Sequence, residues 1–177
     1  MILFDKKEFH FSISDLPALV SYKEKTGGSQ FSIAMIADLY LQGEKVIFYS
    51  AYSMAKDSFL KQAKGNIDES KITLLNSGDQ KALENCLNKY DEHIYFIKNF
   101  ELLNRDLLKK CLKQNKFILS GNLDECYITD ETVYQSFNSQ IFFSEPNVHL
   151  PYKVPILNQY QGYLHQADNN GFLELKL

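Results

Sequence analysis

The sequence predicts an α/β fold built on a mainly parallel sheet, and three features of the chain support this class. Short apolar runs that suit strands alternate with stretches of about 10–15 residues that suit helices. Within the run Lys45–Ser50, the four residues Val46–Tyr49 are all apolar, which is typical of a parallel strand covered on both faces. Near the end of the chain, Asp168–Gly171 is a strong turn signal between two strand-like segments and predicts an antiparallel β-hairpin.

The first elements surround a glycine turn. Residues Ile2–Ile13 alternate loosely and predict a strand or an irregular arm. Ala18–Tyr22 is a short apolar strand, and the turn Gly27-Gly28 follows it. The strongly apolar stretch Phe31–Leu41 then predicts a helix, which Gly43 ends as a C-terminal cap.

The rest of the chain repeats the alternation of helix and strand. The predicted helices are Ser53–Lys64 with Ser53 as N-cap, Gln80–Tyr90, Asn104–Asn115 and a short one near Asp130–Phe137. The predicted strands are Ile72–Leu75, His93–Ile97, Lys116–Ser120, Gln140–Phe143, Gly162–His165 and Phe172–Leu175. Right-handed β-α-β crossovers give a parallel sheet, and the final hairpin extends it at one edge.

Composition predicts one cytoplasmic domain. At 177 residues and 45% hydrophobic, residues 1–177 can form a single core, with 1–17 as an N-terminal arm and 152–177 as the C-terminal β-hairpin. The net charge of −3 gives no general attraction to nucleic acid or anionic lipid. We expect no membrane association, because no apolar run approaches the ~20 residues of a membrane span. Three widely spaced cysteines without a Cys-x-x-Cys pair are typical of reduced cytosolic thiols.

The glycine turn has the frame of a phosphate-binding P-loop. That loop follows the pattern G-x-x-x-x-G-K-[ST], whose lysine reaches the phosphates and whose hydroxyl ligates magnesium. With Ser29 at the hydroxyl position, Gly27 falls on the second glycine. Gly28 then replaces the lysine, and Tyr22 replaces the first glycine. The frame is kept, and the residues that act on phosphate are missing.

From Ala18 to Leu177, the order of elements resembles the RecA-like P-loop ATPase superfamily, particularly its RadA/KaiC/DnaB-like branch. The segments that carry the resemblance are the loop and first helix Gly27–Ala34, the second strand Gly43–Ala51, the following helix and strand Ser53–Ala63 and Lys71–Leu75, the Walker B strand Ile94–Ile97 and the sensor strand Phe117–Asn122. The resemblance implies a RecA-like three-layer α/β/α fold with a mainly parallel sheet and a C-terminal antiparallel β-hairpin.

Three positions depart from what the resemblance expects. Gly28 stands where the family has its loop lysine, Tyr52 where it has the catalytic glutamate, and Lys98 where it has the Walker B aspartate that holds magnesium. Phosphoryl transfer depends on such positioning and electrostatics, so losing all three removes the usual mechanism. The resemblance therefore implies degenerate Walker A and Walker B motifs, a pseudo-ATPase without catalytic residues, and no bound metal.

One alternative keeps nucleotide binding. Lys23 or Lys25, with Thr26 and the turn Gly27–Ser29, lies at a helix N-terminus where backbone N–H groups favour anions. In that case the chain is a nucleotide-binding protein or a slow ATPase with a deviant P-loop. The ordinary interpretation is a pair of solvated loop lysines flanking Glu24.

The other candidate positions also have ordinary structural interpretations, which we favour. Ser29 suits a helix N-cap better than a magnesium ligand. Lys98 could replace the magnesium charge against a phosphate, and we favour an ion pair with Glu101 or Asp124, or a strand end in solvent. Asn122 stands at the family's sensor position, and asparagine is also a common turn residue at strand ends.

Nucleic-acid binding through the surface that the family uses is not expected. The corresponding loop, Asp124–Glu131, holds four acidic residues and no basic one, and so would repel phosphates. Tyr152, Tyr160 and Tyr163 could stack on bases, and packing in the hairpin core is the ordinary interpretation. We therefore expect a protein partner or self-association.

The sequence leads to a catalytically inactive RecA-like domain that acts through protein–protein contacts. It would serve as a structural or regulatory subunit of a larger assembly, as its similarity to the ATP-independent RecA-like subunits of Elongator suggests. We expect no cofactor, with ATP or another nucleotide left to the alternative that uses Lys23 or Lys25. A small α/β enzyme of unrelated chemistry ranks last, because no nucleophile or acid–base cluster supports it and the four histidines lack zinc-ligand spacing.

Overall fold

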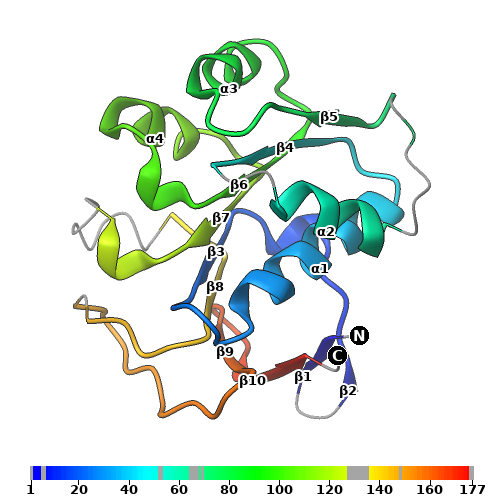
Figure 1. Ribbon diagram of the computed structural model, residues 1–177. Coiled ribbons are helices and arrows are strands. Elements are labelled where there is room, and N and C mark those ends of the chain that lie inside the picture. Colours follow the sequence, from blue (N-terminus) through cyan, green and yellow to red (C-terminus); the bar gives the residue numbers. More distant parts are fainter. Residues whose placement is uncertain are drawn as a thin grey trace.

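A ten-stranded sheet runs through the protein in the order β2-β1-β10-β9-β8-β3-β7-β6-β4-β5 (Figure 1). The computed structural model describes residues 2–4, 7–51, 54–63, 68, 70–126, 136–147 and 149–175. The predicted α/β class with a mainly parallel sheet is confirmed.

Six parallel strands form the main part of the sheet. They are β3 (Ala18–Ser21), β4 (Val46–Ser50), β5 (Ile72–Leu74), β6 (Ile94–Lys98), β7 (Phe117–Gly121) and β8 (Ser139–Phe142). Strand β3 lies in the middle, with Leu19 paired to Leu119 of β7 and to Gln140 of β8. All but β5 are buried along their whole length, as expected of strands covered on both faces.

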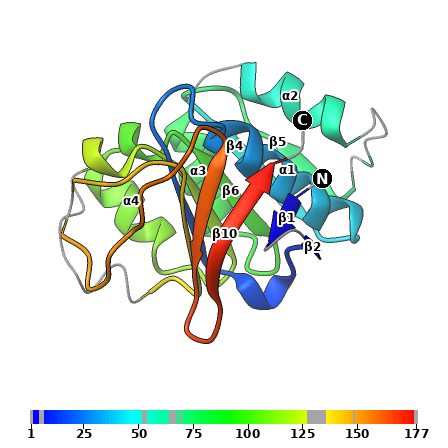
Figure 2. The same ribbon diagram turned by 90° about the horizontal axis from the view of Figure 1, so that it is seen from below.

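Antiparallel strands complete the sheet beyond β8. The predicted hairpin is formed by β9 (Gln161–His165) and β10 (Asn170–Leu175), with His165 paired to Asn170 across the turn. The N-terminal arm extends the sheet further through β1 (Ile2–Phe4) and β2 (Lys7–Glu8). Ile2 pairs with Leu175, so strands from the two ends of the chain lie side by side (Figure 2).

Helices cover both faces of the parallel strands, which gives three layers. The helices are α1 (Gly28–Leu41), α2 (Met54–Gln62), α3 (Gln80–Leu87) and α4 (Arg105–Cys111), with 3₁₀ turns η1 (Ile13–Asp15), η2 (Phe100–Leu102) and η3 (Leu123–Glu125). In Figure 1, α1 and α2 lie on one side of the sheet, and α3 and α4 lie on the other.

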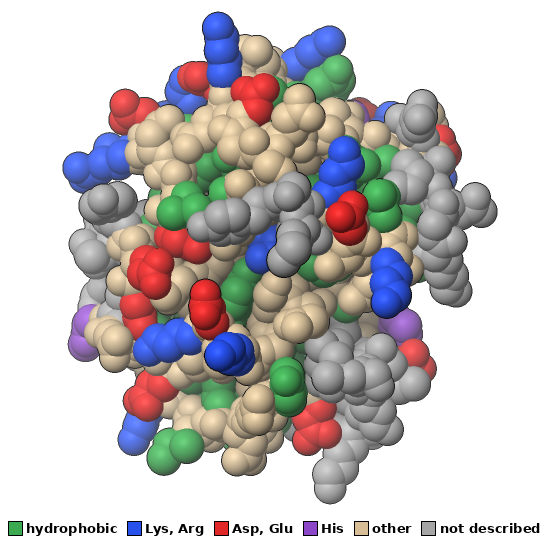
Figure 3. All heavy atoms as spheres, in the orientation of Figure 1, with side chains coloured by type: hydrophobic (Ala, Val, Ile, Leu, Met, Phe, Trp, Pro, Cys, Tyr) green, Lys and Arg blue, Asp and Glu red, His purple; other side chains and the backbone are tan. Residues whose placement is uncertain are grey.

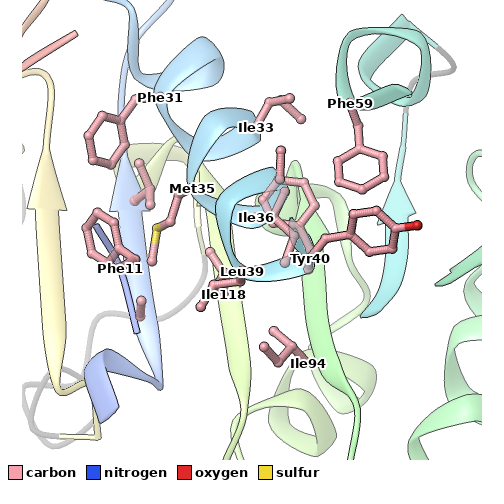
Figure 4. Packing of buried hydrophobic residues seen from close by; sticks show 14 of the residues in the cluster. Phe11, Phe31, Ile33, Met35, Ile36, Leu39, Tyr40, Phe59, Ile94 and Ile118 are labelled. Atoms are coloured by element: carbon pink, nitrogen blue, oxygen red, sulfur yellow. The ribbon is translucent and has the colours of Figure 1, made fainter. Parts of the chain in front are cut away.

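Two hydrophobic cores lie on the two faces of the sheet. Alternate residues of each strand enter opposite cores, as in β3, where Val20 faces α1 and Leu19 faces the side of α3 and α4. The core beneath α1 is rich in aromatic rings, including Phe11, Phe31 and Phe59 (Figure 4). The sheet is therefore fixed on both faces, and its strand ends are held in place.

Most predicted boundaries agree with the structure within a few residues. Gly43 has a φ of +100° just after α1, so the predicted glycine cap is confirmed. Helices α3 and α4 end at Leu87 and Cys111, earlier than predicted, because the chain enters turns there. The predicted N-cap Ser53, and most of the short helix predicted near Asp130–Phe137, lie outside the described residues. None of the helices in the described part of the chain combines the length and apolar character needed to span a membrane.

Candidate functional site

The candidate site lies where β3, β6 and β7 end, next to the start of α1 (Figure 1). Ligands of open α/β sheets bind at such carboxyl ends. We call this region the carboxyl edge and define it by Tyr22, the turn Gly27-Gly28, Lys98 and Ser120. It contains the predicted loop and two of the three predicted departures from the ATPase pattern, Gly28 and Lys98.

The turn leads directly into α1. The Thr26 hydroxyl donates to the Lys23 carbonyl at 2.7 Å, and the Phe31 N–H donates to the Gly27 carbonyl at 3.0 Å. Gly27 is the N-cap and has a φ of +93°, a conformation that side-chain-bearing residues rarely adopt. The prediction that Ser29 is the N-cap was wrong, because the helix already begins at Gly28.

Tyr22 fills the space beneath this turn. A Cβ atom added to Gly28 would lie 2.4 Å from Tyr22 Cβ and 2.6 Å from Tyr22 Cγ, which is far inside contact distance. The Tyr22 side chain is only 8% exposed. Position 28 therefore has no room for a side chain. Tyr22, which stands where the P-loop pattern has its first glycine, fills the space.

A second tyrosine covers the turn at the preceding residue. A Cβ on Gly27 would lie 2.7 Å from Tyr160 Cδ1. Tyr160 itself has a φ of +62°, which is uncommon for a residue with a side chain. The prediction placed Tyr160 in the packing of the hairpin, and the structure places it against the P-loop-like turn just before β9.

Lys98 ends β6 and is buried, with 8% of its surface exposed. Its Nζ donates to the Tyr22 hydroxyl at 3.0 Å and lies 5.6 Å from the centre of the Tyr22 ring. No ion pair among the described residues involves Lys98. The predictions of an ion pair with Glu101 or Asp124, or of a solvent-facing strand end, were therefore wrong.

Two serines continue the hydrogen bonding from Tyr22. The Tyr22 and Ser120 hydroxyl oxygens lie 3.4 Å apart, and Ser120 Oγ lies 2.7 Å from Ser32 Oγ. Ser32 donates to the Ser29 carbonyl at 2.9 Å. Each hydroxyl has one proton, so Ser120 can donate fully to only one of its two neighbours, Tyr22 or Ser32. We call Lys98, Tyr22, Ser120 and Ser32 the polar chain.

Sequence reasoning missed both serines of the polar chain. Each one is fully buried in an otherwise apolar element, Ser32 in α1 and Ser120 in β7. A buried hydroxyl needs a hydrogen-bond partner, so these positions were a usable signal. The partner itself could not be read from the sequence, because Ser32 and Ser120 are 88 residues apart.

The loop lysines have different surroundings from each other. Lys23 forms an ion pair with Asp124 at 3.1 Å, and its side chain remains 43% exposed, as expected of a solvated loop lysine. Lys25 is exposed and has a φ of +63°. Asp124 also accepts from the backbone N–H of Asn147 at 2.7 Å. The Lys23 ammonium is thus already bound by a carboxylate.

Asn122 acts as a turn residue, as expected. Its side chain accepts from the Asp124 N–H at 3.2 Å and donates to Glu125 at 2.7 Å, which starts the 3₁₀ turn η3. Beside it, the Glu101 carboxylate accepts from the Asn122 N–H at 3.2 Å and lies against Gly121. Burial raises the pKa of Glu101, with a small further rise from Glu125. Asn99 Oδ1 is buried near this carboxylate without a hydrogen-bond partner among the described residues.

Clusters of metal-binding side chains and the surroundings of two cysteines also bear on the predictions. Within the described ranges, no group of three His, Cys, Asp or Glu side chains could hold a metal ion. Burial raises the pKa of Cys111 to about 12 and also raises that of Cys86, which keeps both thiols protonated. Tyr52, predicted at the catalytic-glutamate position, lies outside the described residues, so its role stays a prediction.

Charge on the visible surface is mixed. Figure 3 shows basic and acidic side chains interspersed over one face of the molecule. Residues 124 and 125, the described acids of the loop predicted to repel nucleic acid, are engaged by Lys23 and Asn122. The remaining acids of that loop lie outside the described residues.

Two solved structures share this architecture at low sequence identity. The pCW3 conjugation coupling protein TcpA, in its monomer form with ATPγS, aligns with a TM-score of 0.55 and 9% identity over 93% of this chain and 61% of TcpA. The flagellar accessory protein FlaH from Methanocaldococcus jannaschii aligns with a TM-score of 0.53 and 12% identity over 86% of this chain and 78% of FlaH. The chain thus spans less than two thirds of the TcpA chain. No protein-family model and no curated protein matches the sequence.

Proposed function

Starting from a chain with the RecA-like α/β/α fold, we propose that it is a catalytically inactive, pseudo-ATPase domain that acts through protein–protein contacts. In this role it is a structural or regulatory subunit of a larger assembly. The observation that carries the proposal is the Tyr22 side chain, which occupies the space beneath Gly28 and binds the buried Lys98.

The contacts at the turn oppose phosphate binding. A P-loop lysine at position 28 would collide with Tyr22, whose Cβ and ring already lie within 3 Å of any side chain there. The Lys23 ammonium forms an ion pair with Asp124 at 3.1 Å, which competes with its binding to a phosphate. Backbone N–H groups at the start of α1 remain, and alone they lack the clamp that phosphoryl transfer requires.

Lys98 opposes metal binding in the same way. The resemblance expects a carboxylate at the end of this strand, and the structure has an ammonium group there instead. A buried ammonium group repels Mg²⁺ strongly, because the protein interior screens charge less than water does. Together, the missing clamp and the cation at the metal position support loss of hydrolysis.

The proposal of protein contacts rests on the fold and on the segment between β8 and β9. The resembled family works as assemblies in which one subunit packs on the next. In this chain, the Ile156 side chain is 90% exposed and Tyr160 is 38% exposed in the same irregular segment. A fold that is retained without its chemistry, and that exposes apolar side chains, supports a role in assembly.

Calorimetry tests the absence of nucleotide binding. We expect no heat of binding and no thermal shift with ATP and Mg²⁺ at millimolar concentration, and no phosphate release. The matched variant carries Tyr22→Gly and Gly28→Lys, which together restore the full pattern G-x-x-x-x-G-K-S. Saturable binding of ATP to the unchanged protein, lost in Lys23→Ala or Lys25→Ala, would contradict the proposal and favour a deviant P-loop.

Light scattering coupled to size exclusion tests the role in assembly. We expect the full chain to self-associate or to remain with a co-purifying protein, and Ile156→Asp to weaken that association without changing the fold. A strict monomer that retains no protein under gentle purification counts against this part of the proposal.

A further inference from the structure

The polar chain joins four elements of the fold at one buried point. Lys98 comes from β6, Tyr22 directly follows β3, Ser120 comes from β7 and Ser32 comes from α1. Its three links between elements span 76, 98 and 88 residues of sequence. A bound ligand at the carboxyl edge would connect these same elements. Here the protein's own side chains make the connection.

The ammonium group of Lys98 carries the one positive charge of the polar chain, and that charge needs a partner. A buried cation is costly unless it is paired and hydrogen-bonded. Among the described residues, Lys98 has no carboxylate partner, and the Tyr22 hydroxyl oxygen accepts a hydrogen bond from its Nζ at 3.0 Å. The face of the Tyr22 ring, 5.6 Å away, adds a weaker attraction to the cation. The negative partial charge of the Tyr22 oxygen therefore takes the place of a carboxylate partner for Lys98.

We propose that Tyr22 is a built-in ligand of Lys98 that holds the carboxyl edge closed with no molecule bound. This inference rests on the proposed function, since a site that holds nucleotide has no need of an internal substitute. The closed edge fixes the start of α1 against β6 and β7. It thereby keeps one rigid conformation for contact with a partner.

A double-mutant cycle separates this device from ordinary packing. Tyr22→Phe keeps the ring and removes the hydroxyl that accepts from Lys98. We therefore expect the folding equilibrium constant to fall by about 10- to 100-fold. Lys98→Met removes the charge and keeps an apolar stem, and we expect a smaller loss of less than about tenfold. The double variant should be more stable than Tyr22→Phe alone, because no unpaired charge remains buried.

Tyr95→Phe is the matched control. The Tyr95 hydroxyl donates to the carbonyls of Cys86 and Tyr90, which are neutral groups on the other face of the sheet. We expect its loss to add to that of Lys98→Met without any rescue. Hydrogen exchange gives the local readout: in Tyr22→Phe, protection should fall first at the start of α1 and after β6.

The double-mutant cycle tests the built-in ligand, and ATP binding tests the proposed function separately. Additive effects of Tyr22→Phe and Lys98→Met, or unchanged exchange at the start of α1, would overturn the built-in ligand and leave an inactive domain standing. ATP binding by the unchanged protein would overturn the proposed function, whatever the cycle shows. Rescue in the cycle, with no rescue by Lys98→Met of the Tyr95→Phe control, supports the inference.

Discussion

Two neighbouring residues of α1 lie in environments of opposite kinds. Phe31 enters the aromatic core beneath the helix, where its ring centre lies 4.9 Å from that of Phe143 and 5.8 Å from that of Phe11. Ser32 turns to the polar chain and lies 2.7 Å from Ser120. Buried apolar contact area stabilises the first environment. Directional hydrogen bonds, one of them from the charged Lys98, stabilise the second. The two should therefore respond to different changes.

The largest expected effect is in the aromatic core. Phe31→Ala removes a fully buried ring and leaves a cavity, so we expect a loss of about 3–5 kcal/mol in the free energy of unfolding. Urea denaturation measures this loss. The matched control is Phe172→Ala on β10, where the ring is 38% exposed and the expected loss is about 1 kcal/mol. Similar losses for the two variants would contradict the difference in burial.

An intermediate effect is expected at the turn. Gly28→Ala places a Cβ within 2.4 Å of Tyr22, which costs about 1–3 kcal/mol through overpacking. The same substitution in a Tyr22→Ala background should cost little, because the colliding ring is gone. The difference between the two backgrounds, measured by urea denaturation, identifies Tyr22 as the cause. Equal costs in both backgrounds would show that backbone conformation decides instead.

The smallest expected effect depends on pH and belongs to Glu101, which lies against Gly121 beside the carboxyl edge. Burial raises the pKa of Glu101, so the folded state holds its proton more tightly than the unfolded state does. This contribution to stability is complete below the ordinary glutamate pKa of about 4.3 and is lost as the pH rises through the raised value. Relative to Glu101→Gln, the unchanged protein should therefore lose stability as the pH rises above about 4.3 and through the raised pKa of Glu101.

Urea denaturation of both proteins across that range checks the difference. We expect it to be smaller than the effect of Gly28→Ala. Parallel profiles for the two proteins would show that Glu101 titrates normally, and a rise in the relative stability of the unchanged protein with pH would reverse the assigned sign. The cost of Phe31→Ala should not vary over the same range, since its ring packs against the apolar rings of Phe11 and Phe143.

The sheet could be predicted from the sequence because its signals are local. The run Val46–Ser50 is buried along its whole length, as its apolar pattern predicts. The glycine cap after α1 was predicted for the same reason, since a single residue determines it. By contrast, the pairing of β1 with β10 joins the two ends of the chain, and no local pattern encodes such a contact.

The location of the carboxyl edge could be predicted from the sequence, and its side-chain contacts could not. The pattern around Gly27 located the turn, and the position of Lys98 at the end of a strand located the second half of the site. The Lys98–Tyr22 contact was missed, because an aliphatic stem can carry the ammonium either to solvent or inward. Tyr160 was missed because it contacts the turn across more than 130 residues of sequence.

The pairing of Ile2 with Leu175 has a consequence for synthesis of the chain. On the ribosome, β1 emerges first and its partner β10 emerges last of the described strands. The parallel strands can form beforehand, since domains assemble as their segments emerge from the N-terminal side. Strand β1 must wait without its partner until β10 has been translated. Joining the two ends of the chain and opening it at another loop would remove this delay.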